Sequence, residues 1–453
     1  MKNKIILTLF ALLLLPAVSC NRWLEPGSEV EPDRGTLLES PEGVEDAFTG
    51  IYATMSHKDL YGRALTYYIP SILAGHYGMT GTDIAHWMSY PYNADYGQCN
   101  EFAIIDIDRI WRRLYNLVAN ANSIIEYASA ADPEERDPRL RAAKAEALGL
   151  RAFFHFELLR YFSEPYALNP DGRGIPYMTG LTQTAGDFLT IREVTEKILA
   201  DLTRSLEAGE GTPDPGRLRF NRTAALATLA RVHQFRGEAA LAREYALRGI
   251  SERPAYVDWH DPAAPEGYRL LESELIFALN VSRMEEYAAG WVLPGGLGRK
   301  STIMVLTQAG EYYFDEPDDI RNSLWITSIG YDRYCSKFDL SAEKPLMPMI
   351  RLSEMAYIAS EGAESPAEAL AWLNRVRTAR GMESFAEDAS VNIPEEIAAE
   401  YRREFICEGQ LWHYYKRTMA TDIPGNNNFR GRIALYTFPI PEDEWIFGNV
   451  SVE

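Results

Sequence analysis

One cysteine stands where an export signal would place a lipid acceptor. Cys20 follows a short basic start, the apolar run 5–15 and the residues Ala17-Val18-Ser19. The run is too short for a spanning helix, and small residues before the cysteine are typical of a bacterial lipoprotein cleavage site. We therefore predict a signal peptide over residues 1–19 and acylation of the Cys20 thiol. An ordinary secretory signal is the alternative, since lipoprotein signals usually carry Leu where Ala17 stands.

An acylated Cys20 would tether the chain to a membrane surface. Asn21 follows the cysteine, and no Asp is present there to favour retention at an inner membrane. We therefore expect an outer-membrane location, facing the exterior, with residues 20–35 as a lipidated tether.

A second group of residues suits the recognition of sugar rings. Helical periodicity is lost over residues 60–100, where Gly, Tyr, Trp and His dominate. Sugars present flat C–H faces that stack on Trp and Tyr, and their hydroxyls need fixed acceptors and donors. The ligand-binding candidates in this stretch are Asp83, Trp87, Tyr90, Tyr92 and Asn93. Alternatively, any one of these rings belongs to the core or to a surface that meets another protein.

Charged residues at helical spacing could in principle act as acid and base. The residues concerned are Glu146, Arg151, Glu157, Arg160, Arg351, Glu354, Arg402, Arg403, Glu404 and Glu408. At helix crossings such residues normally satisfy each other as ion pairs. We therefore expect a structural role for them and no catalytic residue among them.

No metal or cofactor site is expected. The histidines lack ligand spacing for zinc, and the acidic run at Asp315, Asp318 and Asp319 lacks the alternating spacing of a calcium loop. Gly295-Gly296-Leu297-Gly298 has no strand before it, so it predicts a turn and no phosphate-binding loop. Apart from Cys20, three widely spaced cysteines give no disulfide framework.

The composition excludes further classes of protein. With 45 Lys and Arg against 65 Asp and Glu, the net charge is −20 and offers no basic footprint for nucleic acid. The chain is 46% hydrophobic and 24% charged, which is typical of a globular protein.

The secondary-structure elements that must position these residues are predicted to be mostly pairs of helices. Periodicity predicts helices over about 36–57, 104–250 and 349–417, with loop-rich inserts over about 60–100 and 251–345. The last long helix is expected over 394–417. Antiparallel helices joined by tight turns are typical of a tetratricopeptide-like array, so we predict a mostly α, helical-repeat scaffold.

Several motifs, in order along the chain, carry a resemblance to a known family. They are Trp111 with Tyr115 and Ala119-Asn120-Ala121-Asn122, Ala145-Glu146-Ala147 through Arg160-Tyr161-Phe162, Asn221-Arg222-Thr223-Ala224-Ala225, Ile350-Arg351-Leu352-Ser353-Glu354, Leu373-Asn374-Arg375-Val376-Arg377, Arg402-Arg403-Glu404 with Glu408-Gly409, and Phe438-Pro439-Ile440-Pro441. In these residues the chain resembles the SusD/RagB family of outer-membrane lipoproteins. It departs from the family pattern at 410–417, after the Glu-Gly step.

The resemblance implies a SusD-like domain over residues 36–453 that caps a SusC-like TonB-dependent transporter and captures glycans or, in some members, peptides. It also implies ligand contacts from the later insert, where Trp291, Tyr312 and Tyr313 are candidates. The leading hypothesis is therefore a non-enzymatic, lipid-anchored subunit that binds oligosaccharides and delivers them to the transporter. A peptide-binding subunit, a surface glycosidase and a scaffold that binds only protein are the alternatives.

Overall fold

The computed structural model describes residues 40–78, 86–87, 90, 101–130, 138–182, 184–263, 269–288, 305–306, 316–329, 332–338, 344–387, 389–426 and 432–449. The chain divides into two compact units, Met1–Ala47 and Phe48–Glu453. In the first unit, Ser40 precedes helix α3 (Pro41–Met55), and its hydroxyl accepts a hydrogen bond from the Gly43 amide at 3.1 Å. Ser40 therefore caps this helix, just before a proline in the first helical position.

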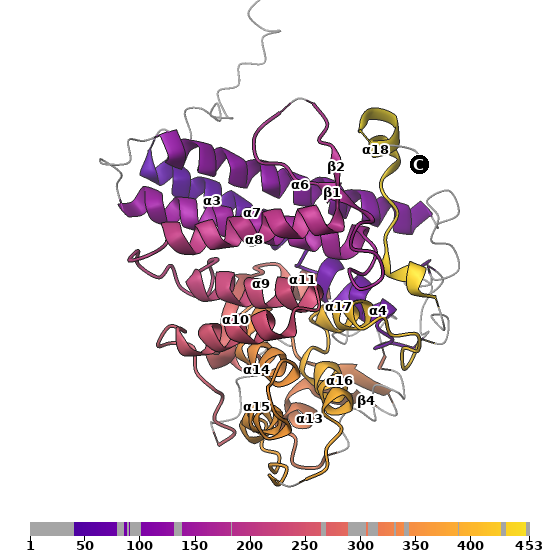
Figure 1. The fold of residues 1–453 in the computed structure, drawn as a ribbon. Coiled ribbons are helices and arrows are strands. Elements are labelled where there is room, and N and C mark those ends of the chain that lie inside the picture. The colour runs from indigo at the N-terminus through magenta and orange to yellow at the C-terminus, as the bar shows by residue number, and fades with distance from the viewer. Residues whose placement is uncertain are drawn as a thin grey trace, which may run out of the picture. The chain divides into compact units, whose positions relative to one another are not determined.

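Long helices follow one another through the second unit. They are α6 (Glu101–Ala130), α7 (Pro138–Phe162), α8 (Ile191–Ala208), α9 (Arg222–Phe235), α10 (Ala239–Ser251), α14 (Leu352–Glu361), α15 (Pro366–Ala379), α16 (Ile393–Glu404) and α17 (Gln410–Arg417). Helices α6, α7 and α8 lie side by side, α9 and α10 form the next pair, and α14 packs on α10 (Figure 1). This arrangement confirms the predicted mostly α, tetratricopeptide-like fold. Among the described helices, none is both long and apolar enough to cross a membrane.

Local sequence explains where these helices begin and which face they bury. Helix α8 starts with a complete capping box, in which Thr190 and Glu193 each accept from the backbone amide of the other. Helix α9 starts at Asn221, whose side chain accepts from the Ala224 amide at 2.8 Å. On α6, apolar residues at helical spacing, from Ile107 to Ala128, are buried against α7.

Short strands and helices fill the connections. In the described part of the chain, the strands form three antiparallel pairs: β1 (Arg173–Pro176) with β2 (Phe188–Thr190), β3 (Leu275–Asn280) with β6 (Leu346–Arg351), and β4 (Ile326–Ile329) with β5 (Asp332–Cys335). The short helical elements are the π-helix Ala64–Tyr68, α4 (Ile69–Leu73), the 3₁₀ turns Glu272–Glu274 and Ile433–Tyr436, α11 (Met284–Ala288), α13 (Ile320–Trp325) and α18 (Glu442–Phe447). Strand β3 carries a continuous apolar run, and all of its residues except Asn280 are buried.

The start of the expected loop over 60–100 is helical. Residues 64–73 form the π-helix and α4, and every one of them is buried. Pro70 opens α4 at a position where the missing amide costs nothing. This part of the expected insert therefore belongs to the core.

The last helix, expected to run unbroken over 394–417, is two helices. Helix α16 ends at Glu404, and α17 begins after Gly409, which has a φ of +82°. A side chain at Gly409 would place its Cβ 2.5 Å from the Leu65 carbonyl oxygen. The close approach of the π-helix segment therefore requires glycine and forces the break.

Buried charges join the helices and strands of the C-terminal half. The Glu404 carboxylate binds Arg380 at 2.6 Å and Arg321 at 3.1 Å, and all three side chains are fully buried. Arg380 also binds Glu274 at 2.7 Å, and Arg321 also binds Glu400 at 2.8 Å. Burial alone would raise the pKa of Glu400, but Arg321 and Arg403 outweigh it and lower that pKa to about 2.

The charged residues of the motifs form ion pairs, as their predicted structural role requires. Some of their partners, however, differ from those that the sequence spacing suggests. Glu157 pairs with Arg160 within α7. Arg351, however, binds Glu408 at 2.7 Å, while its expected neighbour Glu354 binds Arg231 on α9 at 2.6 Å. Sequence spacing within one helix cannot show such pairs, because the partners come from distant segments.

The ion pairs of Glu400 predict acid-sensitive stability. Its pKa is about 2 in the folded chain, against an ordinary value of 4.5, so its stabilising contribution is complete above about pH 4.5 and is lost as pH falls toward 2. We expect Glu400→Gln to lower the free energy of unfolding at pH 7 and to reduce its loss between pH 5 and pH 2 by roughly 3 kcal/mol. Urea titrations across this pH range measure both effects.

Glu286→Gln is the matched control. Glu286 pairs with Arg283 on the surface, where both side chains are exposed, so this change should leave the unfolding free energy within about 1 kcal/mol. Equal acid sensitivity in the Glu400→Gln and wild-type proteins would contradict the assigned role of Glu400.

Candidate functional site

Two of the aromatic residues predicted to bind ligand lie in the described part of the chain, and both are buried. Trp87 is 0% exposed and Tyr90 is 2% exposed. The Trp87 indole donates a hydrogen bond to Asp106 at 3.0 Å, and both rings contact Phe438, at centroid distances of 5.6 Å. In this arrangement neither ring offers a face to a sugar, so packing is the role that the structure gives them.

The other predicted site residues lie outside the described residues. They are Cys20, Asp83, Tyr92, Asn93, Trp291, Tyr312 and Tyr313. Their lipid or ligand contacts therefore stay predictions. Two further rings of the later insert, Tyr287 and Trp325, are described and buried, and Trp325 lies beneath the Lys337 ammonium at 3.5 Å. That contact is a cation–π interaction inside the core.

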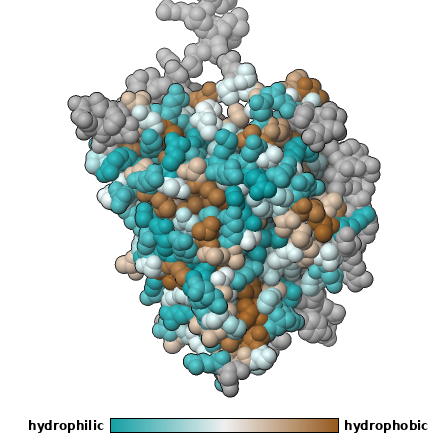
Figure 2. All heavy atoms as spheres, in the orientation of Figure 1, coloured by the Kyte–Doolittle hydropathy of each residue, from teal (hydrophilic) through white to brown (hydrophobic). Residues whose placement is uncertain are grey.

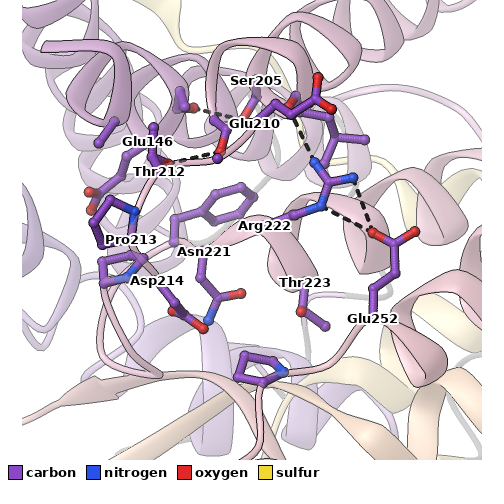
Figure 3. Close-up of a pocket in the computed structure, with 18 residues that line it drawn as sticks. Glu146, Ser205, Glu210, Thr212, Pro213, Asp214, Asn221, Arg222, Thr223 and Glu252 are labelled. Atoms are coloured by element: carbon purple, nitrogen blue, oxygen red, sulfur yellow. Dashed lines mark hydrogen bonds and ion pairs between the residues drawn. The ribbon is translucent and has the colours of Figure 1, made fainter. Parts of the chain in front are cut away.

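A pocket of about 430 Å³ opens between α7, the end of α8 and the start of α9 (Figure 3). The connection over 209–221 forms one wall, and the buried Phe220 of this connection also lines the pocket. Polar side chains from several elements line it, namely Glu146, Ser205, Glu210, Thr212, Asp214, Asn221, Arg222, Thr223 and Glu252. The pocket thus combines apolar and polar surface, the apolar share being the larger, and its lining carries more carboxylates than cations.

Several of these carboxylates accept hydrogen bonds from neighbouring side chains. Glu146 accepts two hydrogen bonds from Arg219, at 2.6 and 2.7 Å, and Glu252 binds Arg222 at 3.1 Å. Asp214 accepts from the Tyr256 hydroxyl at 3.2 Å. Burial would raise the pKa of Glu252, but hydrogen bonds from Arg248 and Arg222 lower it. Glu252 is therefore a hydrogen-bond acceptor and not a proton donor at neutral pH.

The pocket can hold a small polar molecule, but it shows none of the features of a metal centre. Among the described residues, no group of three or more His, Cys, Asp or Glu side chains could hold a metal ion. Asp319 belongs to the acidic run whose spacing did not predict a calcium loop, and it accepts from the Arg321 amide and guanidinium, at 2.9 Å each. It caps α13 and neutralises a buried cation.

No local sequence pattern predicts this pocket. Asn221, Arg222 and Thr223 stand out in the sequence only as a family motif, and the loop before them carries no site motif. The run Pro213-Asp214-Pro215 after α8 is the signal that could have found it, because prolines and acceptors in a loop between helices often frame a binding site.

Proteins of known structure share this fold, and a family model matches part of the sequence. Residues 29–233 match a family model described as SusD-like, starch-binding and associating with outer membrane. Similar solved structures include a SusD-like carbohydrate binding protein from Bacteroides vulgatus, with a TM-score of 0.73, 17% identity and coverage of 91% of this chain and 97% of that one. A SusD superfamily protein from Bacteroides thetaiotaomicron has a TM-score of 0.71 at 19% identity, over 90% of this chain and 98% of that one.

Surface glycan-binding protein A from Bacteroides fluxus has a TM-score of 0.63 at 18% identity, with coverage of 89% of this chain and 94% of that one. At these identities, the likeness to solved structures concerns the fold. The search of curated proteins found no match. The family model and the fold together confirm the resemblance to the SusD/RagB family that the sequence motifs indicated.

The burial of Trp87 predicts a structural effect of its removal. Trp87→Ala leaves a cavity beside Phe438 and removes a hydrogen bond to Asp106, so the free energy of unfolding should fall by roughly 3–5 kcal/mol. Denaturant titration measures this loss. Trp87→Phe should recover part of the stability. Wild-type stability with weakened glycan binding would instead assign Trp87 to the ligand.

Proposed function

We propose that this chain is a lipid-anchored protein of the outer-membrane surface, which binds oligosaccharides and delivers them to a SusC-like TonB-dependent transporter. The observation that carries the proposal is the fold, which extends over about nine-tenths of the chain and is shared with proteins described as carbohydrate-binding and glycan-binding. The family description, starch-binding and associating with outer membrane, supports the same class of ligand and location. The predicted lipidation of Cys20 supplies the anchor.

The electrostatics of the described residues favour binding over hydrolysis. A glycosidase needs one carboxyl group whose raised pKa keeps it protonated as the acid. Each described carboxyl group with a shifted pKa is instead shifted downward, because hydrogen bonds and nearby cations outweigh burial. These groups stay ionised at neutral pH and serve as acceptors.

The proposed ligand contacts are the aromatic and polar residues of the two inserts. They are Asp83, Tyr92, Asn93, Trp291, Tyr312 and Tyr313. Trp87 and Tyr90 have a different role in this proposal, because their contacts with Phe438 attach the first insert to the core. The rings that remain would stack on sugar faces, and Asp83 and Asn93 would meet hydroxyls.

Removal of one stacking ring should weaken glycan binding. We expect Trp291→Ala to reduce affinity by about 1–3 kcal/mol while the chain stays folded. Affinity gels with maltohexaose, cellohexaose, xylohexaose and mannohexaose would first identify a retained glycan, and calorimetry would then compare the variants. Trp372→Ala is the matched control, because Trp372 lies half-buried on the scaffold helix α15.

A peptide ligand is the alternative within the same type of complex. Retention of peptides, with no glycan of the panel bound by the wild-type chain, would support that alternative and contradict the carbohydrate proposal. Unchanged affinity in Trp291→Ala would reject only the placement of the site.

Loss of the lipid acceptor should separate anchoring from binding. In cells, Cys20→Ser should move the protein from the membrane fraction to the soluble fraction and impair glycan uptake, because the local concentration at the transporter falls. In solution, its glycan affinity should equal that of the wild type. Asn21→Ala is the control and should stay in the membrane fraction. Membrane retention of Cys20→Ser would contradict lipidation at this residue.

A further inference from the structure

The C-terminal helix α18 leaves three large apolar side chains in contact with solvent. Trp445 is 41% exposed, Ile446 is 60% exposed and Phe447 is 77% exposed. No residue of this helix is buried. Figure 2 shows apolar side chains at the surface where α18 lies, at the upper right of the view. Exposed apolar groups of this size in adjacent positions mark binding sites more often than chance surface composition does.

Phe447 differs from its neighbour Ile446 because it borders a pocket. This pocket of about 280 Å³ lies between α6, the β1–β2 hairpin and α18. Trp111 and Tyr115 of α6 form one wall, and Asp443 and Glu444 of α18 form another with Phe447. Ile446 does not line the pocket.

Hydrogen bonds and ring contacts fix these walls. The Trp111 indole donates to Glu444 at 2.8 Å, and the Tyr115 hydroxyl donates to the Pro176 carbonyl at 2.8 Å. On the other side, Asn449 donates to the Ala185 carbonyl at 2.9 Å, just beyond the end of α18. The Arg173 guanidinium lies 5.1 Å from the centre of the Trp445 ring. Helix α18 is therefore held to the hairpin on both sides of Phe447, and a ligand would meet a preformed site.

The chemistry of the lining selects one class of ligand. A flat aromatic ring stacks on the C–H face of a sugar, and carboxylate oxygens accept hydrogen bonds from its hydroxyls. The Asp443 carboxylate makes no hydrogen bond to another described residue, and one oxygen of Glu444 is not used by Trp111. Among the described residues that line the pocket there is no Lys, Arg or His, which disfavours phosphate, sulfate and uronate ligands.

The volume of the pocket limits how much of an oligosaccharide it can hold. At about 280 Å³ the pocket lies near the lower end of small-molecule sites, which suits one sugar ring and not a long chain. A ring bound against Phe447 would carry the rest of an oligosaccharide out into solvent.

We propose that Phe447, Asp443 and Glu444 form a binding site for a single neutral pyranose unit of an oligosaccharide, separate from the two aromatic inserts. The inference rests on the proposed carbohydrate-binding function and adds a second point of attachment for the same glycan class. Two attachment points on one chain raise the overall affinity for a long glycan above that of either point alone.

The test compares Phe447→Ala with Ile446→Ala, its matched control on the same helix. Binding of maltohexaose, cellohexaose, xylohexaose and mannohexaose to the full chain is measured by calorimetry. For a hexasaccharide that the wild type binds, we expect Phe447→Ala to weaken affinity 5- to 50-fold and Ile446→Ala less than twofold. Asp443→Ala should also weaken affinity, and saturation-transfer NMR should show contact between aromatic protons and sugar C–H protons that Phe447→Ala removes.

The outcomes separate this inference from the proposed function. Wild-type binding with unchanged affinity in Phe447→Ala would overturn the α18 site and leave the carbohydrate function intact. Absence of binding to every member of the panel by the wild type would overturn both. Equal losses of glycan affinity in Phe447→Ala and Ile446→Ala would also overturn the α18 site. Unchanged glycan affinity in Phe447→Ala with loss of a co-purifying transporter would instead assign the exposed ring to a protein contact.

Discussion

The arrangement of the C-terminal half depends on the buried carboxylate of Glu404. It lies between Arg380 and Arg321, and each of these guanidinium groups binds a further buried carboxylate, Glu274 or Glu400. The charges come from α16, α13, the end of α15 and the turn before β3. Removal of one partner from such a network leaves an uncompensated charge, which costs several kcal/mol. The elements must therefore assemble together, and their relative positions are fixed by charge as well as by packing.

This constraint has a functional consequence. Carboxylates that neutralise buried arginines are not free to transfer protons, so the acidic residues most deeply placed in the fold serve its stability. Among the described residues, groups open to a ligand lie in the pocket beside α9 and on the short helix α18.

The sequence predicted much of this fold, because helix periodicity and caps are local properties. Asn221 and Thr190 begin helices through hydrogen bonds within three residues, and the turn at Gly237 separates two helices of ordinary length. The pairing of Arg351 with Glu408 and of Glu354 with Arg231 could not be predicted, since those partners meet only in the folded chain. The break between α16 and α17 was missed because the cause is the close approach of Leu65 to Gly409, a contact between segments far apart in sequence.

The candidate site was less predictable than the fold. An aromatic residue in a loop has the same sequence signature whether its ring is open to ligand or packed on Phe438, as for Trp87. Phe447 was not predicted as a ligand residue, yet its ring is exposed. That exposure depends on how α18 packs against the β1–β2 hairpin, which no local sequence pattern shows. Pocket residues drawn from three or four elements share no spacing, so only the folded chain brings them together.

Recovery of a bound glycan tests most directly whether this chain binds sugars without cleaving them. A hexasaccharide retained by the purified protein would be incubated with it for many hours, and the glycan would then be released and its length measured by mass spectrometry. The account predicts that all of the hexasaccharide is recovered intact. Steady production of shorter sugars, abolished by replacing a single Glu or Asp, would contradict it.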